Sequence, residues 1–491
     1  MGDAVAEQRF SPADRARYRE KVRRCLDVLA RMLAEGRFED RVRRVGLELE
    51  LALIDEAGDP ALVNTRVLEA IGRPDFQAEL GQFTVEVNVE PEPVDGPVLA
   101  RIEDQLRARL NRAEGLARSE GARLVAVGIL PTLTPGQLTR ESITPNPRFH
   151  LLDEQIVAAR GETIRIRIDG TEPLAVDADT IAYEAACTSL QLHLQVTPEQ
   201  FPSHWNAAQA IAGVQLAVGA NSPYLTGHRL WDETRIALFA QATDTRAAEL
   251  VAQGVRPRVW FGQNWVSSVL ELFEENVRYF PALLPVIGQE DPIAVVDAGG
   301  VPRLSELRLH NGTVYRWNRP VYDTAGGRAH LRVENRVLPA GPSVADIMAN
   351  AAFYYGLVAA LAGDEDPVWS RMPFQTAEEN FHAAARHGLD APLTWPGLGE
   401  LPARRLIADH LLGLADQGLA AWGVDAGDRD RLLGIIAGRC TTGRTGAAWQ
   451  TALVARLQHR GLDRAAALRE MTRRYAAHVR ANEPVHTWPL D

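Results

Sequence analysis

The stretch Gly46-Leu47-Glu48-Leu49-Glu50-Leu51-Ala52-Leu53 places a leucine at every odd position from 47 to 53. Strict alternation is typical of a β-strand with one face on an apolar core and the other in polar surroundings, and it favours an antiparallel sheet. Similar alternation marks further segments, strong at 82–90, 190–196 and 331–337 and weaker at 163–169 and 306–310.

Helical sequence separates the predicted strands. Helices are expected at about 96–120, 198–219 and 343–361. A first helix opens at Ser11-Pro12-Ala13-Asp14, where serine is the N-cap and proline the first helical residue. Strands and helices segregated in this way indicate an α+β fold.

From about Phe374 to Val485 the strand pattern disappears and the sequence, rich in Ala, Leu and Arg, has helical periodicity. We therefore expect three parts: an N-terminal helix in residues 1–40, a sheet domain that carries the site in 41–366, and a C-terminal helical subdomain in 367–491. The turn Asp364-Glu365-Asp366-Pro367 is the expected junction.

The composition is that of a soluble globular protein. The 491 residues are 46% hydrophobic and 24% charged, and they contain no uninterrupted apolar run of transmembrane length. Met1 to Phe10 carries acids where a signal peptide needs an apolar stretch, so a cytoplasmic location is expected. The net charge of −11 argues against a nucleic-acid partner. The expected partners are small molecules rather than nucleic acid or membrane, and the oligomeric state stays open.

Lysine is almost absent. Of the 53 basic residues only Lys21 is a lysine, and a solvated position on the first helix is expected for it. Schiff-base enzymes need a lysine amine, and a P-loop needs a lysine after its glycines. Both mechanisms are therefore excluded, so any ATP phosphates must be held by arginine and metal ions.

Acidic side chains gather at the polar positions of the strands. Glu48 and Glu50 lie on the same side of one strand, about 7 Å apart from the rise per residue. A single strand of this kind is more often a solvated sheet face, but the first three strands carry no cation except potentially His193. Clustered carboxylates repel one another unless a cation lies between them, and Mg²⁺ or Mn²⁺ binds such oxygens. The sequence predicts a metal-binding sheet face with the candidate ligands Glu48, Glu50, Glu79, Glu86, His193 and Glu334.

Arginines indicate an anionic ligand. Arg332 and Arg336 flank Glu334 on its face of the strand. The polar segments nearby carry four more arginines: Arg229, Arg235, Arg316 and Arg319. Arginine binds phosphate and carboxylate through two parallel hydrogen bonds, although each arginine alone is more often a surface salt-bridge partner. Of these arginines, we single out Arg336 and Arg235 as candidates for binding an anionic ligand.

Five motifs together resemble the glutamate–cysteine ligase superfamily, specifically its second group of bacterial and plant-like carboxylate–amine ligases. They are Gly46-Leu47-Glu48-Leu49-Glu50, Glu79-Leu80-Gly81-Gln82-Phe83 through Glu86 and Asn88, the strand at 190–196, Ala220-Asn221-Ser222-Pro223 followed by Arg235, and Val333-Glu334-Asn335-Arg336-Val337-Leu338-Pro339. The resemblance covers roughly residues 40 to 365. Each motif is short, and their order and spacing make the match specific.

The resemblance implies a fold like that of glutamine synthetase, with a curved, mostly antiparallel sheet of about six strands and helices on one side. It implies that the six candidate ligands bind Mg²⁺ on the concave face, that Arg332 and Arg336 contact the nucleotide, and that Arg336 and Arg235 act on the reacting groups. The sequence departs from the family pattern at Gln191 and Gln195, which flank the histidine. It departs again at Asn335, which faces the core or marks a bulge.

The implied activity is ATP- and Mg²⁺-dependent formation of an amide between the γ-carboxylate of glutamate and the amine of cysteine through an acyl phosphate, as in glutathione biosynthesis. One alternative is a ligase of the same family with a different amine or acid. Another is a non-catalytic relative that binds nucleotide and metal. A glycosidase with paired carboxylates is more remote, because it needs neither the arginines nor the histidine.

Overall fold

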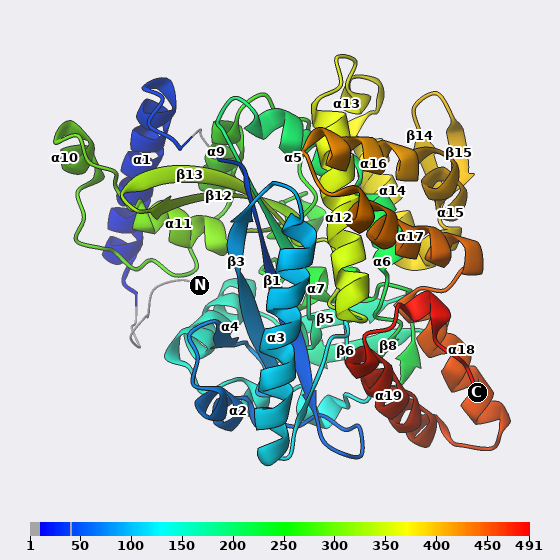
Figure 1. Cartoon of the computed structure of the whole chain (residues 1–491). Helices are drawn as coiled ribbons and strands as arrows, with labels where there is room; N and C mark the ends of the chain where they lie inside the picture. The colour runs from blue at the N-terminus through cyan, green and yellow to red at the C-terminus, as the bar shows by residue number, and fades with distance from the viewer. Residues whose placement is uncertain (1–9, 40–41) are drawn as a thin grey trace.

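The computed structural model describes residues 10–39 and 42–491 (Figure 1). Residues 1–9, on which the expectation about a signal peptide rests, lie outside the described residues, as does the predicted boundary at 40 and 41. The first helix, α1 (Pro12–Ala34), begins where the sequence predicts, and Ser11 and Asp14 form its capping box.

One antiparallel sheet organises the fold. Its strands follow the order β12-β13-β7-β1-β3-β2, with β4 paired to the end of β1. The strands are β1 Arg44–Ile54, β2 Phe76–Ala78, β3 Thr84–Pro93, β4 Arg123–Val125, β7 Leu190–Val196, β12 Asn318–Ala325 and β13 Arg328–Asn335. Every pairing among them is antiparallel, so the predicted α+β fold with a curved antiparallel sheet is confirmed.

The leucines of β1 form one side of the core. Leu47, Leu49, Leu51 and Leu53 are each at most 2% exposed. This apolar face packs beneath the helices α3 (Val98–Ser119), α5 (Phe201–Ala210) and α12 (Val344–Ala362). Burying one leucine side chain contributes about 2 kcal/mol. Because the period is two, a shift of one residue would bury the glutamates instead, and this fixes the register.

Helix α12 lies against the apolar face of the sheet, behind the strands that carry the acids. By length and composition it could cross a membrane, but 89% of its most apolar window is buried inside the protein, as in a core helix. The hydroxyl of Tyr355 lies 3.1 Å from the carbonyl oxygens of both Gly46 and His193. Tyr355 of helix α12 therefore contacts the backbones of both β1 and β7, close to the candidate ligand His193.

The other elements before the C-terminal part are short. Those helices are α2 Asn64–Ile71, α4 Pro147–Arg160, α6 Ala212–Gly219, α7 Arg235–Ala242, α8 Ala248–Ala252, α9 Val269–Tyr279, α10 Pro292–Asp297 and α11 Ser305–Gly312. Three small sheets accompany them: β5 Ile164–Ile168 with β6 Leu174–Ala178, β8 Tyr224–Leu225 with β9 His228–Arg229, and β10 Val259–Trp260 with β11 Tyr315–Arg316.

Two predictions about secondary structure are wrong. The segment 306–310, expected as a weak strand, is part of helix α11, because its buried residues are Glu306, Leu307 and His310 at helical spacing. The segment after Phe374 also contains strands, β14 (Pro392–Trp395) and β15 (Gly399–Pro402), which form a hairpin. Four residues are too few for alternation to be seen.

The predicted C-terminal helices are present, and two of them pack on α12. The C-terminal helices are α13 Val368–Arg371, α14 Phe374–His387, α15 Ala403–Leu406, α16 Leu412–Ala421, α17 Ala426–Thr442, α18 Gly446–His459 and α19 Arg464–Ala481. Of these, α16 and α17 contact α12, and Figure 1 shows α18 and α19 on the side of the molecule away from α1. The division into three parts at these boundaries remains a prediction.

The structure corrects the prediction for Lys21 and decides between the two alternatives for Asn335. Lys21 is half-buried rather than solvated, and its Nζ donates to the carbonyl oxygen of Glu290 at 2.7 Å. Asn335 faces the core and marks no bulge, since the register of β13 with β7 runs unbroken from Leu331 to Asn335. Its side-chain Nδ2 donates to Asn318 Oδ1 at 2.8 Å, which gives this nitrogen a partner in a side chain that is 0% exposed.

Candidate active site

The register of four strands brings the predicted acids onto one face. Glu50 on β1 lies opposite Glu86 on β3. His193 on β7 lies opposite Glu334 on β13. Side chains two residues apart on a strand share a face, so Glu48 joins Glu50 beside these pairs.

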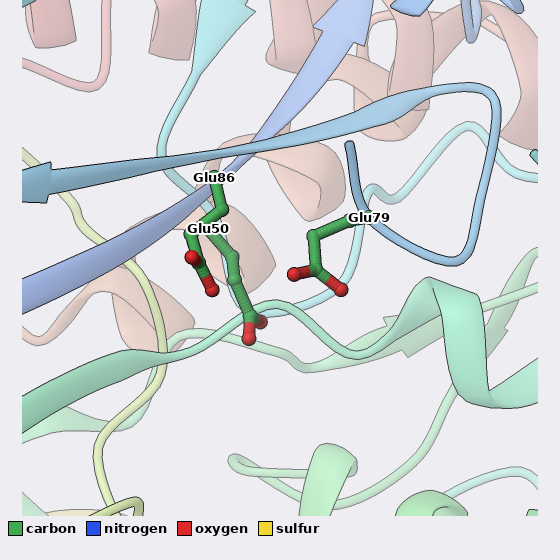
Figure 2. A group of neighbouring side chains, drawn as sticks. All are labelled: Glu50, Glu79 and Glu86. Carbon is green, nitrogen blue, oxygen red and sulfur yellow. The ribbon is translucent and has the colours of Figure 1, made fainter. Parts of the chain in front are cut away.

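Three carboxylates converge at the centre of this face. One oxygen from each of Glu50, Glu79 and Glu86 lies within 4.8 Å of the others, which is close enough to hold one metal ion. Figure 2 shows Glu50 and Glu86 reaching down from neighbouring strands and Glu79 approaching from the loop after β2. We call these three residues the carboxylate cluster.

The carboxylate cluster carries more negative charge than the surrounding protein balances. Burial, with Glu48 and Glu50 close by, raises the pKa of Glu86 to about 7. Burial, with Glu86 and Glu50 close by, raises the pKa of Glu79 well above its ordinary value. The pKa of Glu50 is also raised by burial, although Arg336 and the backbone N–H of Ser189 oppose the shift. A divalent cation would balance this charge, and carboxylate oxygens are the ligands that Mg²⁺ prefers.

A second group joins Glu48 to His193. The imidazole Nε2 lies 3.1 Å from Glu48 Oε1, and this contact lowers the pKa of Glu48 to about 2 although burial acts in the opposite direction. The same Nε2 is buried and makes no hydrogen bond of good geometry among the described residues. Nδ1 accepts from Nε of Arg332 at 3.1 Å. A nitrogen left without a hydrogen bond beside a carboxylate fits a metal ligand.

Glu334 is held differently from the other predicted ligands. Its oxygens accept from Arg319 at 2.7 Å and from Arg336 at 2.9 Å. These two guanidinium groups lower its pKa despite complete burial. Arg336 also donates to Gln191 Oε1 at 2.6 Å, so the departure from the family pattern at Gln191 has a defined role here. The protein alone already balances the charge of Glu334.

The guanidinium group of Arg235 makes its hydrogen bonds to other groups of the protein. At the start of α7, its Nε donates to Glu233 Oε1 at 3.0 Å, and its Nη atoms donate to the carbonyl oxygens of Arg336 and Val337. Both Arg235 and Glu233 are buried. Arg235 therefore fixes the segment that carries Arg336, and its contact with substrate remains a prediction.

Two cavities meet at Glu48. The larger, of about 740 Å³, we call the arginine-lined cavity; its charged lining includes Arg44, Arg73, Arg109, Arg328, Arg332, Glu48 and His193. The smaller, of about 220 Å³, we call the carboxylate cavity; its polar lining includes Glu48, the carboxylate cluster, Glu184, Arg148, Arg235, Arg319, Arg336 and Tyr315. Glu48 lines both, so the two cavities adjoin at this residue.

Sequence reasoning missed several residues of this site. Glu184 lies in a 3₁₀-helix (Ile181–Ala186), where no alternation reveals which side chains face the cavity. Arg73 lies in the loop before β2 and Arg109 lies on α3, where no strand alternation indicates that a side chain faces the cavity. Two predicted neighbours lie elsewhere: Arg316 pairs with Glu275, and Arg229 lines neither cavity.

Known proteins agree with this architecture. A comparison with curated protein sequences finds no match. The glutamate–cysteine ligase of Francisella tularensis, solved in complex with AMP, superposes with a TM-score of 0.56 at 11% identity, over 92% of this chain and 91% of that one. A bifunctional glutathione synthetase from Pasteurella multocida gives a TM-score of 0.47 at 13% identity, over 93% of this chain and 55% of that one. The first of these two shows a shared fold.

The family is shown by the sequence as a whole. The model of glutamate-cysteine ligase family 2 matches residues 44–470, which include every predicted site residue from Glu48 to Arg336. The matched range spans both cavities, all strands of the main sheet and most of the C-terminal helices. The chain therefore belongs to glutamate-cysteine ligase family 2, a family of ATP-dependent carbon–nitrogen ligases.

Proposed function

We propose that the chain joins the γ-carboxylate of glutamate to the amine of cysteine, with ATP and Mg²⁺, through an acyl phosphate. The observation that carries the proposal is the carboxylate cluster, whose oxygens lie within 4.8 Å of one another close to the junction of two cavities. Such a cluster suits a reaction in which two anions, a carboxylate and a triphosphate, must approach each other.

The donor set fits a resident divalent metal. Glu50, Glu79 and Glu86 supply hard oxygen ligands, and their raised pKa values reflect charge that a cation would balance. Glu48 and His193 are the proposed ligands of a further ion. When bound, Mg²⁺ supplies neutralisation of the charge on the phosphates and on the incoming carboxylate. Glu334 stays a proposed ligand. Its two arginine partners compete with the metal ion for its carboxylate oxygens.

The arginine-lined cavity suits the nucleotide. Its volume of about 740 Å³ lies in the usual range of cofactor sites. Five arginines line it, and arginine binds phosphate through paired hydrogen bonds. Arg332, the predicted nucleotide contact, reaches it from β13 and pairs with Asp323 at 3.2 Å.

The carboxylate cavity suits the two amino acids and the transfer. A free carboxylate does not react with an amine, because oxide is too poor a leaving group. Phosphorylation by ATP turns the leaving group into phosphate. Arg336, held by Glu334 and Gln191, is oriented to bind the transferred phosphoryl group, and Arg235 keeps its backbone in place.

A panel of acceptors tests the proposal. Purified protein with glutamate and ATP is given each candidate amine, and ADP release is followed with and without Mg²⁺. Release that depends on both cysteine and Mg²⁺ supports the proposal and, with it, a role in glutathione biosynthesis. The cytoplasmic location stays a separate prediction. Release with another amine assigns a different acceptor. If the protein binds nucleotide and metal but releases no ADP with any acceptor, it is a non-catalytic relative.

A further inference from the structure

Glu184 is a carboxylate in the reaction cavity that the carboxylate cluster does not use. It lines the carboxylate cavity from the 3₁₀-helix Ile181–Ala186 and is half-buried there. It is not one of the three acids whose oxygens converge within 4.8 Å. Among the described residues, no hydrogen bond or ion pair engages its side chain.

An ionised carboxylate in this position needs a cation of its own. Burial, together with repulsion from Glu50, raises the pKa of Glu184 to about 8. Arg336, which makes its ion pair with Glu334, opposes the shift only in part. One metal ion in the carboxylate cluster would balance the cluster and leave Glu184 outside it. Because no ion pair among the described residues holds Glu184, its carboxylate is free to pair with a cationic group of a bound ligand.

Aromatic rings line the same cavity. Tyr315, Trp317 and Phe239 all contribute to its wall. Phe239 meets Tyr315 edge to face, with ring centroids 5.3 Å apart, and lies 5.9 Å from Trp317. A cavity lined by both a carboxylate and aromatic rings favours an organic ammonium group, through a charged hydrogen bond and cation–π attraction.

We infer that Glu184 binds the ammonium group of the acceptor amine in the carboxylate cavity, and so selects positively charged primary amines. The inference rests on the proposed function, because it assumes that an acyl group is formed in the same cavity. It assigns Glu184 to recognition of the acceptor and not to activation of the carboxylate, which involves Arg336 and the carboxylate cluster. Loss of Glu184 should therefore weaken binding of the acceptor amine and leave binding of glutamate and ATP unchanged.

The test compares a charged acceptor with an uncharged one. Hydroxylamine is largely uncharged at neutral pH and reacts with acyl phosphates to give a hydroxamate, so it needs no ammonium site. In Glu184→Gln we expect the KM for cysteine to rise about tenfold or more, the loss expected for one hydrogen bond to a charged group. Hydroxamate formation and the KM values for glutamate and ATP should stay at wild-type levels. Glu184→Asp, which keeps the charge, should recover part of the cysteine affinity.

The controls separate the inference from the proposed function. Glu199 is exposed and lines neither cavity, so Glu199→Gln should match the wild type with both acceptors. If Glu184→Gln weakens cysteine and hydroxylamine equally, or leaves the KM for cysteine unchanged, the inference is overturned while the ligase activity stands. If the wild-type protein forms no hydroxamate and releases no ADP with any amine, the proposed function itself is wrong and the inference falls with it.

Discussion

Glu50 and Glu86 lie directly opposite each other on β1 and β3, and each is only 8% exposed. Like charges at facing positions of an antiparallel pair destabilise a sheet. The fold thus contains a repulsive pair at its centre, beside a third carboxylate from Glu79. Such a pair is understandable where binding of a cation offsets the repulsion, and we therefore expect the stability of the protein to depend on metal.

Replacing Glu86 by glutamine should separate stability from metal binding. Glu86→Gln removes one of the facing charges, so the metal-free protein should become more stable by about 0.5 kcal/mol. Thermal unfolding with and without MgCl₂ measures both effects. The wild type should gain stability on addition of Mg²⁺, and the variant should gain little. Glu154→Gln, at an exposed position of α4, is the matched control and should behave like the wild type.

Stability of the metal-free protein should fall as the pH rises from about 4.5 to about 7. In this window the folded protein keeps a proton on Glu86, whose pKa is about 7, while the unfolded chain has lost it. Where the folded state binds more protons than the unfolded state, stability decreases with pH. Denaturant unfolding in a chelator at several pH values should show a shallower fall for Glu86→Gln. An identical slope in both proteins would contradict the assignment.

Glu48→Gln and Glu334→Gln should differ in their effect on the fold. Both are expected to abolish ADP release, since both are proposed metal ligands. Glu48 has His193 as its close partner, and its loss should leave the fold intact. Glu334 balances Arg319 and Arg336, so its replacement leaves two half-buried guanidinium groups short of a partner and should cost about 3 kcal/mol. Circular dichroism and unfolding curves distinguish the two, and near-normal ADP release by either variant would refute its metal role.

Arg336→Lys should lower kcat with little change in the KM for ATP. A lysine keeps the charge but cannot reproduce the guanidinium contacts to Gln191 and Glu334, so its charge is not held at the transferred group. Loss of one positioned donor in a reaction centre typically lowers kcat on the order of 100-fold. Steady-state ADP release gives the two constants. A variant with unchanged kcat would remove Arg336 from the transfer step.

Arg235 should prove to be mainly a positioning residue. Arg235→Met leaves Glu233 buried without its partner, and breaking a buried ion pair in this way costs roughly 3–5 kcal/mol. Adding Glu233→Gln should recover much of that stability, which a double-mutant cycle by denaturant unfolding measures. Activity should not return with the stability, because the carbonyl groups of Arg336 and Val337 still lack their donor. Full recovery of both would exclude a role in placing Arg336.

The sequence by itself determined the sheet and its two faces. The period of two in β1, β3, β7 and β13 assigned leucine and valine to the core and the acids to the opposite face, since a strand turns alternate side chains in opposite directions. Order and spacing of the motifs were enough to indicate the family. Short segments such as 306–310 failed because five residues fit a helix and a strand equally well.

Only the tertiary structure decided which of those side chains meet. Alternation gives the face of a residue but not its partners across the strands, so the sequence could not separate the carboxylate cluster from Glu334, which two arginines neutralise. Nor could it find Glu184 or assign Arg235 to the chain behind Arg336, because both arise from contacts between segments far apart in sequence. Faces follow from local geometry, whereas charge balance in a buried site follows from the packing of the whole chain.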